Sequence, residues 1–248
     1  MSLEQQIIIF LFTTLGGSFG IAFGGGSFVV LPILFLMGID PKIAVATNVA
    51  AVVAQLLTGA IIFGRHKKVH YRLATKATPF YLLGGIIGAF ALIKIDPAFL
   101  KSLVALAIIF FAVFSFFRKK HVMDAPCHSS VTKSPMAYPL LVLVGTYQVL
   151  TTAGAGTILM FIFMYLFNLN LKCSIYTRQF VTLPTMIVGA GILIQSGLVN
   201  WTLLIPLAFG RIVGGIIGSE IVIRVQKKKL SAVFSVVVVL MAIKTLLG

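Results

Sequence analysis

Residues 23–28 read Phe-Gly-Gly-Gly-Ser-Phe, and they lie in the middle of an otherwise apolar run that extends from residue 6 to residue 37. Each glycine weakens a helix by about 1 kcal/mol relative to alanine, so three in succession predict a break. As helices, the pieces 6–23 and 27–37 would be roughly 27 Å and 16 Å long. The second piece is too short to cross a bilayer core of about 30 Å, so we expect it to re-enter the membrane or to cross short and tilted.

A second copy of this pattern follows 130 residues later, where Gly154-Ala155-Gly156-Thr157 interrupts the apolar run 137–167. The alignment of the two copies needs no gap, and it pairs Ser27 with Thr157. It also pairs Lys42 with Lys172, Thr47 with Thr177, Leu100 with Leu230, and 84–88 with 214–218, both of which read Gly-Gly-Ile-Ile-Gly. Duplicated membrane halves are typical of secondary transporters, whose site lies where the halves meet.

The composition is that of a membrane protein. Hydrophobic residues make up 59% of the chain and charged residues 10%, with a mean hydropathy of +1.10, whereas soluble domains carry about 25% charged residues. We therefore expect an all-α polytopic membrane protein with no room for a soluble catalytic core, and so not an enzyme. The apolar segments are 6–37, 43–63, 74–93, 98–117, 137–167, 173–195, 201–225 and 230–247.

The polar segments divide the chain. We expect a first membrane repeat over 1–117, a cytoplasmic linker loop over 118–136, and a second membrane repeat over 137–248. Each repeat then contains one broken or re-entrant segment plus three transmembrane helices. The net charge of +15 raises the possibility of nucleic-acid binding, but the basic residues cluster in short loops, as they do on the cytoplasmic side of membrane proteins. We expect no nucleic-acid partner.

The distribution of basic residues predicts the orientation of the halves. If each broken segment crosses once, the halves are parallel and the Lys and Arg residues outside the membrane divide 10 to 8. If each returns or crosses twice, the halves are inverted and 14 of them share one face, with only Lys42, Lys94, Lys101 and Lys244 on the other. Cytoplasmic loops carry the excess of positive charge, which favours two inverted repeats with both termini outside the cytoplasm.

The two glycine breaks are candidates for an anion site. Ser27 and Thr157 follow the breaks and are residues that favour helix N-caps. Helix starts present unpaired N–H groups and partial positive charge, and broken backbone at membrane depth is tolerated where it lines a cavity. Two such starts related by a two-fold axis would bind an anion near the midplane. The alternative is that the glycines only allow close helix packing.

Arg178 and Arg211 fall inside apolar segments. An arginine inside a membrane is costly and usually faces a partner or a polar path. The one acidic residue clearly within a span is Glu220, which can pair with Arg224 four residues later. An anionic substrate would therefore supply the missing negative charge. The alternative for Arg178 is that its side chain extends to the cytoplasmic surface.

Thr47-Asn48 and Thr177-Arg178 occupy matching positions of the two copies. They could line a path or bond between helices; Gln55, Gln148, Thr151 and Thr152 are weaker candidates of the same kind. We interpret the Gly-Gly-Ile-Ile-Gly segments as helix contacts, and we expect no metal and no cofactor. The residues predicted to bind the substrate are Gly24, Gly25, Gly26, Ser27, Thr47, Asn48, Gly154, Gly156, Thr157, Thr177, Arg178 and Arg211.

The glycine break with its following Pro32, the sequence Gly38-Ile39-Asp40-Pro41 and the segment 44–48 resemble the sulfite exporter TauE/SafE family of membrane permeases. Residues 154–178 resemble that family's second repeat, and the resemblance covers essentially the whole chain. It implies a multi-pass transporter of the cell inner membrane for sulfite or related sulfur-containing anions. The second copy departs from the first by carrying Arg178 where the first has Asn48, which bears on the choice of substrate.

The functional hypothesis from the sequence is a secondary transporter, and an exporter by resemblance, of a small sulfur-containing anion such as sulfite or an organosulfonate. Its partners would be that anion and the lipid bilayer. A passive anion channel and a non-transporting membrane subunit remain as alternatives. The sequence alone does not select the anion, the direction of transport or a coupling ion.

Overall fold

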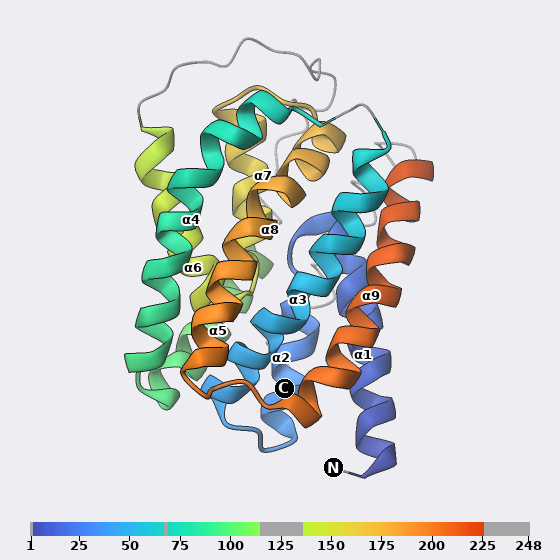
Figure 1. Ribbon diagram of the computed structural model, residues 1–248, viewed down its shortest axis with the longest axis vertical. Coiled ribbons are helices and arrows are strands. Elements are labelled where there is room, and N and C mark those ends of the chain that lie inside the picture. Colours follow the sequence, from blue (N-terminus) through green and yellow to red (C-terminus); the bar gives the residue numbers. More distant parts are fainter. Residues whose placement is uncertain (1, 67–68, 115–135, 226–248) are drawn as a thin grey trace.

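The computed structural model describes residues 2–66, 69–114 and 136–225, apart from the side chains of 108–114, and the regular structure in these ranges is entirely α-helical (Figure 1). The all-α polytopic fold predicted from the sequence is thereby confirmed. The predicted segment 230–247 and most of the linker loop lie outside the described residues. The helices are α1 (Leu3–Phe23), α2 (Ser27–Leu36), α3 (Pro41–Gly64), α4 (Tyr71–Lys94), α5 (Pro97–Phe114), α6 (Ala137–Thr151), α7 (Ala155–Tyr165), α8 (Leu171–Gln195) and α9 (Trp201–Arg224).

Five helices of the described part, α1, α3, α4, α8 and α9, are long and apolar enough to cross a membrane by length and composition. Their outward faces carry exposed apolar side chains, including Leu15, Leu83, Phe90 and Phe209. A soluble protein rarely exposes so much contiguous apolar surface, whereas lipid tails solvate it. The chain is therefore a multi-pass membrane protein.

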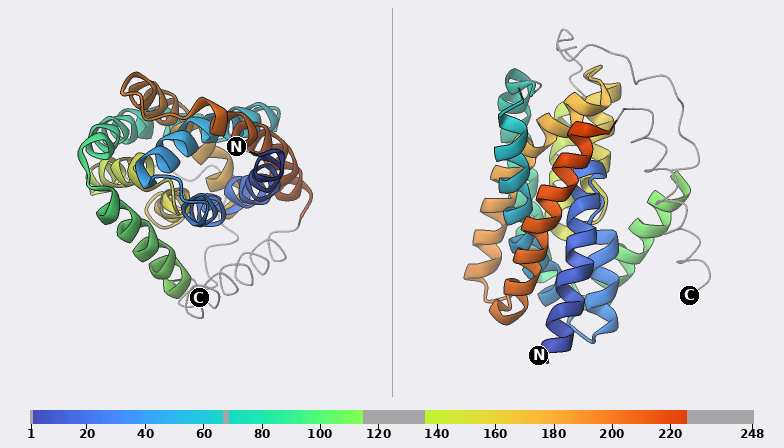
Figure 2. Two further views of the ribbon diagram at one scale, coloured as in Figure 1. Left: turned by 90° about the horizontal axis from the view of Figure 1, so that it is seen from below. Right: turned by 90° about the vertical axis from the view of Figure 1, so that its right-hand side faces the viewer.

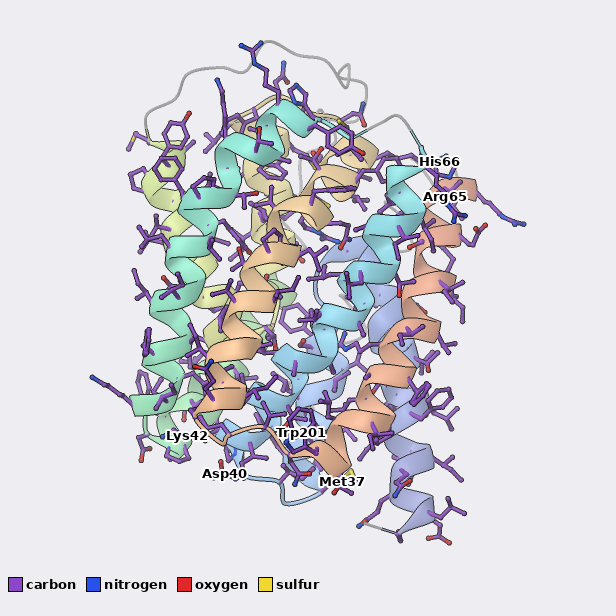
Figure 3. The ribbon with its side chains drawn as sticks, viewed as in Figure 1. Met37, Asp40, Lys42, Arg65, His66 and Trp201 are labelled. Carbon is purple, nitrogen blue, oxygen red and sulfur yellow. The ribbon has the colours of Figure 1, made fainter. Side chains whose placement is uncertain are left out.

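The first glycine break lies where the sequence placed it, since α1 ends at Phe23 and α2 begins at Ser27. Helix α2 lies beside α1 and returns toward the end of the bundle from which α1 started (Figure 2). Met37 and Asp40 accordingly lie at that end, while Arg65 and His66, which follow α3, lie at the opposite end (Figure 3). The broken segment therefore turns back within the bundle.

The second break is shifted from its predicted position. Helix α6 ends at Thr151 and α7 begins at Ala155, so the break covers 152–154, and Thr157 is the third residue of α7. Phe23 thus corresponds to Thr151, 128 residues on, whereas α3 and α8 begin 130 residues apart. The gapless alignment is wrong in this region, because α7 and the link after it together hold two more residues than α2 and its link.

Corresponding helices of the two halves run in opposite directions. Thr47, near the start of α3, accepts a hydrogen bond through Oγ1 from the backbone N of Asn200, just before α9, at 3.0 Å. Thr177, near the start of α8, accepts one from the backbone N of His70, just before α4, also at 3.0 Å. The start of α3 therefore lies beside the end of α8 and the reverse also holds. Each half contributes a hydroxyl to a helix start of the other half.

The Gly-Gly-Ile-Ile-Gly segments are helix contacts, as predicted. A Cβ on Gly84 or Gly88 of α4 would overlap backbone carbonyl oxygens of α6, and one on Gly214 or Gly218 of α9 would overlap those of α1. Small residues let helix backbones approach closely in a membrane. The first helix of each half thus packs on a late helix of the other half.

Candidate functional site

A small buried cavity lies where the two breaks meet, and Gly24, Gly26, Ser27 and Gly156 contribute to its wall. Its volume, measured to the centres of water molecules, is about 30 Å³. One water needs ~10–15 Å³ on this measure, so the cavity has room for about two waters or a small ion. Arg178 and Arg211 also line it. The structure therefore brings together, at one place, six of the residues that the sequence singled out.

The two breaks touch each other directly. A Cβ on Gly156 would lie 2.9 Å from the Cα of Gly24, and one on Gly24, whose φ is +85°, would overlap the backbone of Gly156. A Cβ on Gly26 would overlap the carbonyl oxygen of Gly16 in α1. These three glycines thus permit close packing as well as lining the cavity. A larger residue at any of them would disturb the backbone before it filled the cavity.

The predicted N-cap roles of Ser27 and Thr157 are wrong. The N-caps of α2 and α7 are Gly26 and Gly154, and neither makes a side-chain cap. The hydroxyl of Thr157 instead donates to the carbonyl oxygen of Phe23 at 2.6 Å, which ties α7 to the end of α1. Of the residues at the breaks, Gly25, Gly154 and Thr157 are not part of the cavity wall.

Arg211 is anchored by neutral acceptors and is only 1% exposed. Its Nη1 donates to Oε1 of Gln55 at 2.7 Å, and its Nη2 donates to Oδ1 of Asn48 at 2.6 Å and to the hydroxyl of Ser27 at 3.3 Å. Its Nε has no hydrogen-bond partner within the described part of the chain. A buried cation that keeps a free donor beside a cavity is equipped to bind an anion there.

Asn48 lies behind Arg211 and fixes its position. The side-chain amide of Asn48 donates to the hydroxyls of Ser27, at 2.9 Å, and of Thr152, at 2.8 Å. Because its oxygen simultaneously accepts from Arg211, the amide orientation is set by both ends. Asn48 is fully buried and is not part of the cavity wall.

Arg178 also points into the bundle, being 2% exposed, so the alternative in which its side chain reaches the cytoplasmic surface is wrong. Its Nη2 donates to the carbonyl oxygens of Gly20, at 3.1 Å, and Ile21, at 2.7 Å, and its Nη1 donates to that of Gly156 at 3.2 Å. A cation at the C-terminal end of a helix is favoured by the helix dipole. Arg178 therefore joins the end of α1 to the first turn of α7.

Thr47 and Thr177 do not line the cavity. Their hydroxyls are occupied by the backbone N–H groups of Asn200 and His70 described above. For this pair the structure favours the alternative of bonds between helices over contact with a substrate.

The family model described as sulfite exporter TauE/SafE matches residues 9–245. The chain belongs to this family. It is 23% identical to the probable membrane transporter protein ORF9 of Sinorhizobium sp over 98% of this chain and 94% of that protein. It is 26% identical to the probable membrane transporter protein YjnA of Bacillus subtilis, over 96% and 98% respectively. For YfcA of Escherichia coli K12, also named a probable membrane transporter protein, the values are 22%, 96% and 88%.

No solved structure matches the chain. The TauE/SafE assignment and the polytopic helical structure together make this protein a membrane transporter at the level of class.

Sequence reasoning missed two polar residues near the centre of this TauE/SafE protein. Thr182 lines the cavity, and the hydroxyl of Tyr81 in α4 donates to Oε1 of Gln148 at 3.2 Å. A signal for Tyr81 was present, because the 130-residue repeat pairs it with Arg211 just as it pairs Asn48 with Arg178. Gln55, Gln148 and Thr152, which were weaker candidates, all line the cavity.

The charges of the cavity are not balanced by carboxylates. Among the described residues the single ion pair is the predicted one between Arg224 and Glu220, with Nε and Oε2 2.8 Å apart at the protein surface. The partners of Arg178 and Arg211 are carbonyls, side-chain amides and a hydroxyl. Two guanidinium groups therefore face one small cavity with neutral partners only, an arrangement that is costly unless an anion enters.

Proposed function

We propose that this TauE/SafE protein is a secondary transporter that exports a small sulfur-containing oxyanion, such as sulfite or an organosulfonate, across the cytoplasmic membrane. The observation that carries the proposal is the cavity that both guanidinium groups line without a carboxylate partner. An oxyanion offers several acceptor oxygens and the negative charge that two arginines lack. The family description supports sulfite and export, and the names of the relatives support transport.

The closed cavity favours a carrier over a channel. Ser27, Arg178 and Arg211 are each at most 2% exposed, so the residues of the cavity wall that would hold the anion are shut off from the surface. A channel needs a continuous path, whereas a carrier passes through an occluded state. Inverted repeats that exchange contacts support the same mechanism, because one half can rock against the other around a fixed site.

The orientation that we propose puts the N-terminus outside the cytoplasm. Arg65, Arg72, Lys172 and Arg224 lie at the end of the bundle where α3 and α9 finish and α4 and α8 begin. We assign that end to the cytoplasm, since positive charge concentrates there. The two opposed halves then form inverted repeats, and both chain termini lie outside.

Counterflow in proteoliposomes tests the transport function. Purified protein is reconstituted into vesicles loaded with unlabelled sulfite, and uptake of radiolabelled sulfite is followed against protein-free vesicles. We expect transient, saturable accumulation of label, because a carrier exchanges its substrate through one site. Linear, unsaturated uptake would indicate a channel, and no uptake above protein-free vesicles with sulfite or organosulfonates would refute the proposal.

A labelling experiment tests the orientation. In a cysteine-free background (Cys127→Ser, Cys173→Ala), a single cysteine is placed at Lys94 or at His66, both of which are exposed at opposite ends of the bundle. We expect a membrane-impermeant thiol reagent to label the Lys94→Cys protein in intact cells and the His66→Cys protein only after permeabilisation. The reverse pattern would mean that the protein is inserted the other way round.

A further inference from the structure

The acidic residues of this chain all lie away from the transport cavity. The sequence contains five, and four of them are described. Glu4 lies in the first turn of α1, Asp40 and Asp96 accept hydrogen bonds from backbone N–H groups at the starts of α3 and α5, and Glu220 pairs with Arg224. The fifth, Asp124, falls in the polar linker 118–136. None of the four described carboxylates belongs to the cavity wall.

The groups that do line the cavity cannot exchange a proton near neutral pH. Arginine stays protonated in proteins, and the remaining polar wall consists of side-chain amides, hydroxyls and glycine backbone. Of the four histidines, His66 and His70 lie at the end of the bundle between α3 and α4, and His121 and His128 fall in the linker. Tyr81, near the cavity, carries a phenol, which is protonated at neutral pH.

A metal or sodium ion would find no suitable ligands in this cavity. Hard cations bind to carboxylate and carbonyl oxygens. The carbonyl oxygens of Gly20, Ile21 and Gly156 are occupied by the guanidinium group of Arg178. Two guanidinium charges beside the same cavity would also repel an entering cation. The cavity is therefore arranged for an anion alone.

We propose that the transported anion crosses without a proton or metal ion carried by the protein, so that the membrane potential itself drives export. This inference rests on the proposed function and adds its energy source. The cytoplasm is electrically negative, so an anion that crosses alone is pushed outward. Each elementary charge moved through 100 mV gains about 2.3 kcal/mol, which corresponds to a concentration ratio of roughly 50-fold.

A reversal-potential measurement tests this inference. Proteoliposomes carry a tenfold sulfite gradient in buffers alkaline enough to keep sulfite fully deprotonated, and potassium with valinomycin sets the potential. If the doubly charged anion moves alone, net flux should vanish at about 30 mV, the value that balances a tenfold ratio for two charges. Adding a pH gradient between two such alkaline buffers, or replacing sodium by choline, should leave this reversal potential unchanged.

Each result decides the matter. A reversal potential that shifts with the pH gradient would show coupling to protons, and one that shifts with sodium would show coupling to sodium; either overturns the inference while the proposed transport function stands. Flux that ignores the potential would show electroneutral exchange and also overturns it. If protein-containing vesicles show no sulfite counterflow at all, the proposed function fails first. Protein-free vesicles and the Arg211→Gln protein measure leak.

Discussion

Replacing Arg211 with glutamine is expected to lower sulfite counterflow at least about 100-fold while the protein still inserts into the membrane. The change removes one positive charge from the cavity together with the Nε–H donor that lacks a partner. A hydrogen bond to a charged group contributes about 1.5–3 kcal/mol, and each 1.4 kcal/mol is a factor of ten in affinity. Initial counterflow rates, and thermal stabilisation of the purified protein by added sulfite, measure the effect.

Arg224 provides a matched control, because it lies in the same helix but pairs with Glu220 at the surface. Arg224→Gln should change counterflow by less than twofold. Arg211→Lys should restore part of the rate, since lysine keeps the charge but cannot donate to Gln55 and Asn48 in the same planar geometry. If the Arg211→Gln protein inserts and transports sulfite as fast as the unmodified protein, Arg211 has only a structural role.

Replacing Gly24 with alanine is expected to abolish folded protein almost completely. The residue has a φ of +85°, and its Cβ would overlap the backbone of Gly156 and lie against Nη1 of Arg178. The second glycine break would have to move, and the hydrogen bonds that join α1 to α7 would move with it. The yield of monodisperse protein after detergent extraction, together with its midpoint of thermal unfolding, measures this effect.

Gly38 separates the two causes of that loss. It has a similar φ of +74°, but a Cβ there would meet nothing within 4 Å. Gly38→Ala should therefore carry only the conformational penalty of about 1–2 kcal/mol and should give protein in good yield. If Gly24→Ala protein is as abundant and as stable as Gly38→Ala protein, the direct contact between the two breaks is not essential.

The two breaks show what a sequence pattern can and cannot locate. Three consecutive glycines fixed the first break at its correct residues, because no helix continues easily through them. The second break was misplaced by two residues, because it begins at Thr152, whose φ is +53°, a left-handed conformation that residues other than glycine rarely adopt. The repeat was also matched mainly after residue 41, where the spacing of 130 holds.

The candidate site was predictable in its cationic and glycine components and not in its hydroxyls. Arg178 and Arg211 stood out because a buried guanidinium is expensive in a membrane. Thr47 and Thr177 looked equivalent to other polar residues, and only the packed structure shows that their hydroxyls hold the starts of α9 and α4. The chemistry of a threonine gives no preference between a neighbouring backbone and a substrate, so its role depends on which helix lies beside it.

The exchange of packing partners between the halves has a consequence for biosynthesis. Helix α1 leaves the ribosome first, yet the glycine face that packs on it belongs to α9, which is made near the end of the chain. Helix α4 likewise awaits α6 from beyond the linker. Nascent α1 must therefore remain in the bilayer with its packing face covered by lipid or by the insertion machinery until translation is nearly complete. The first half, expressed by itself, would lack the partners of both α1 and α4, and supplying the second half as a separate polypeptide would provide them.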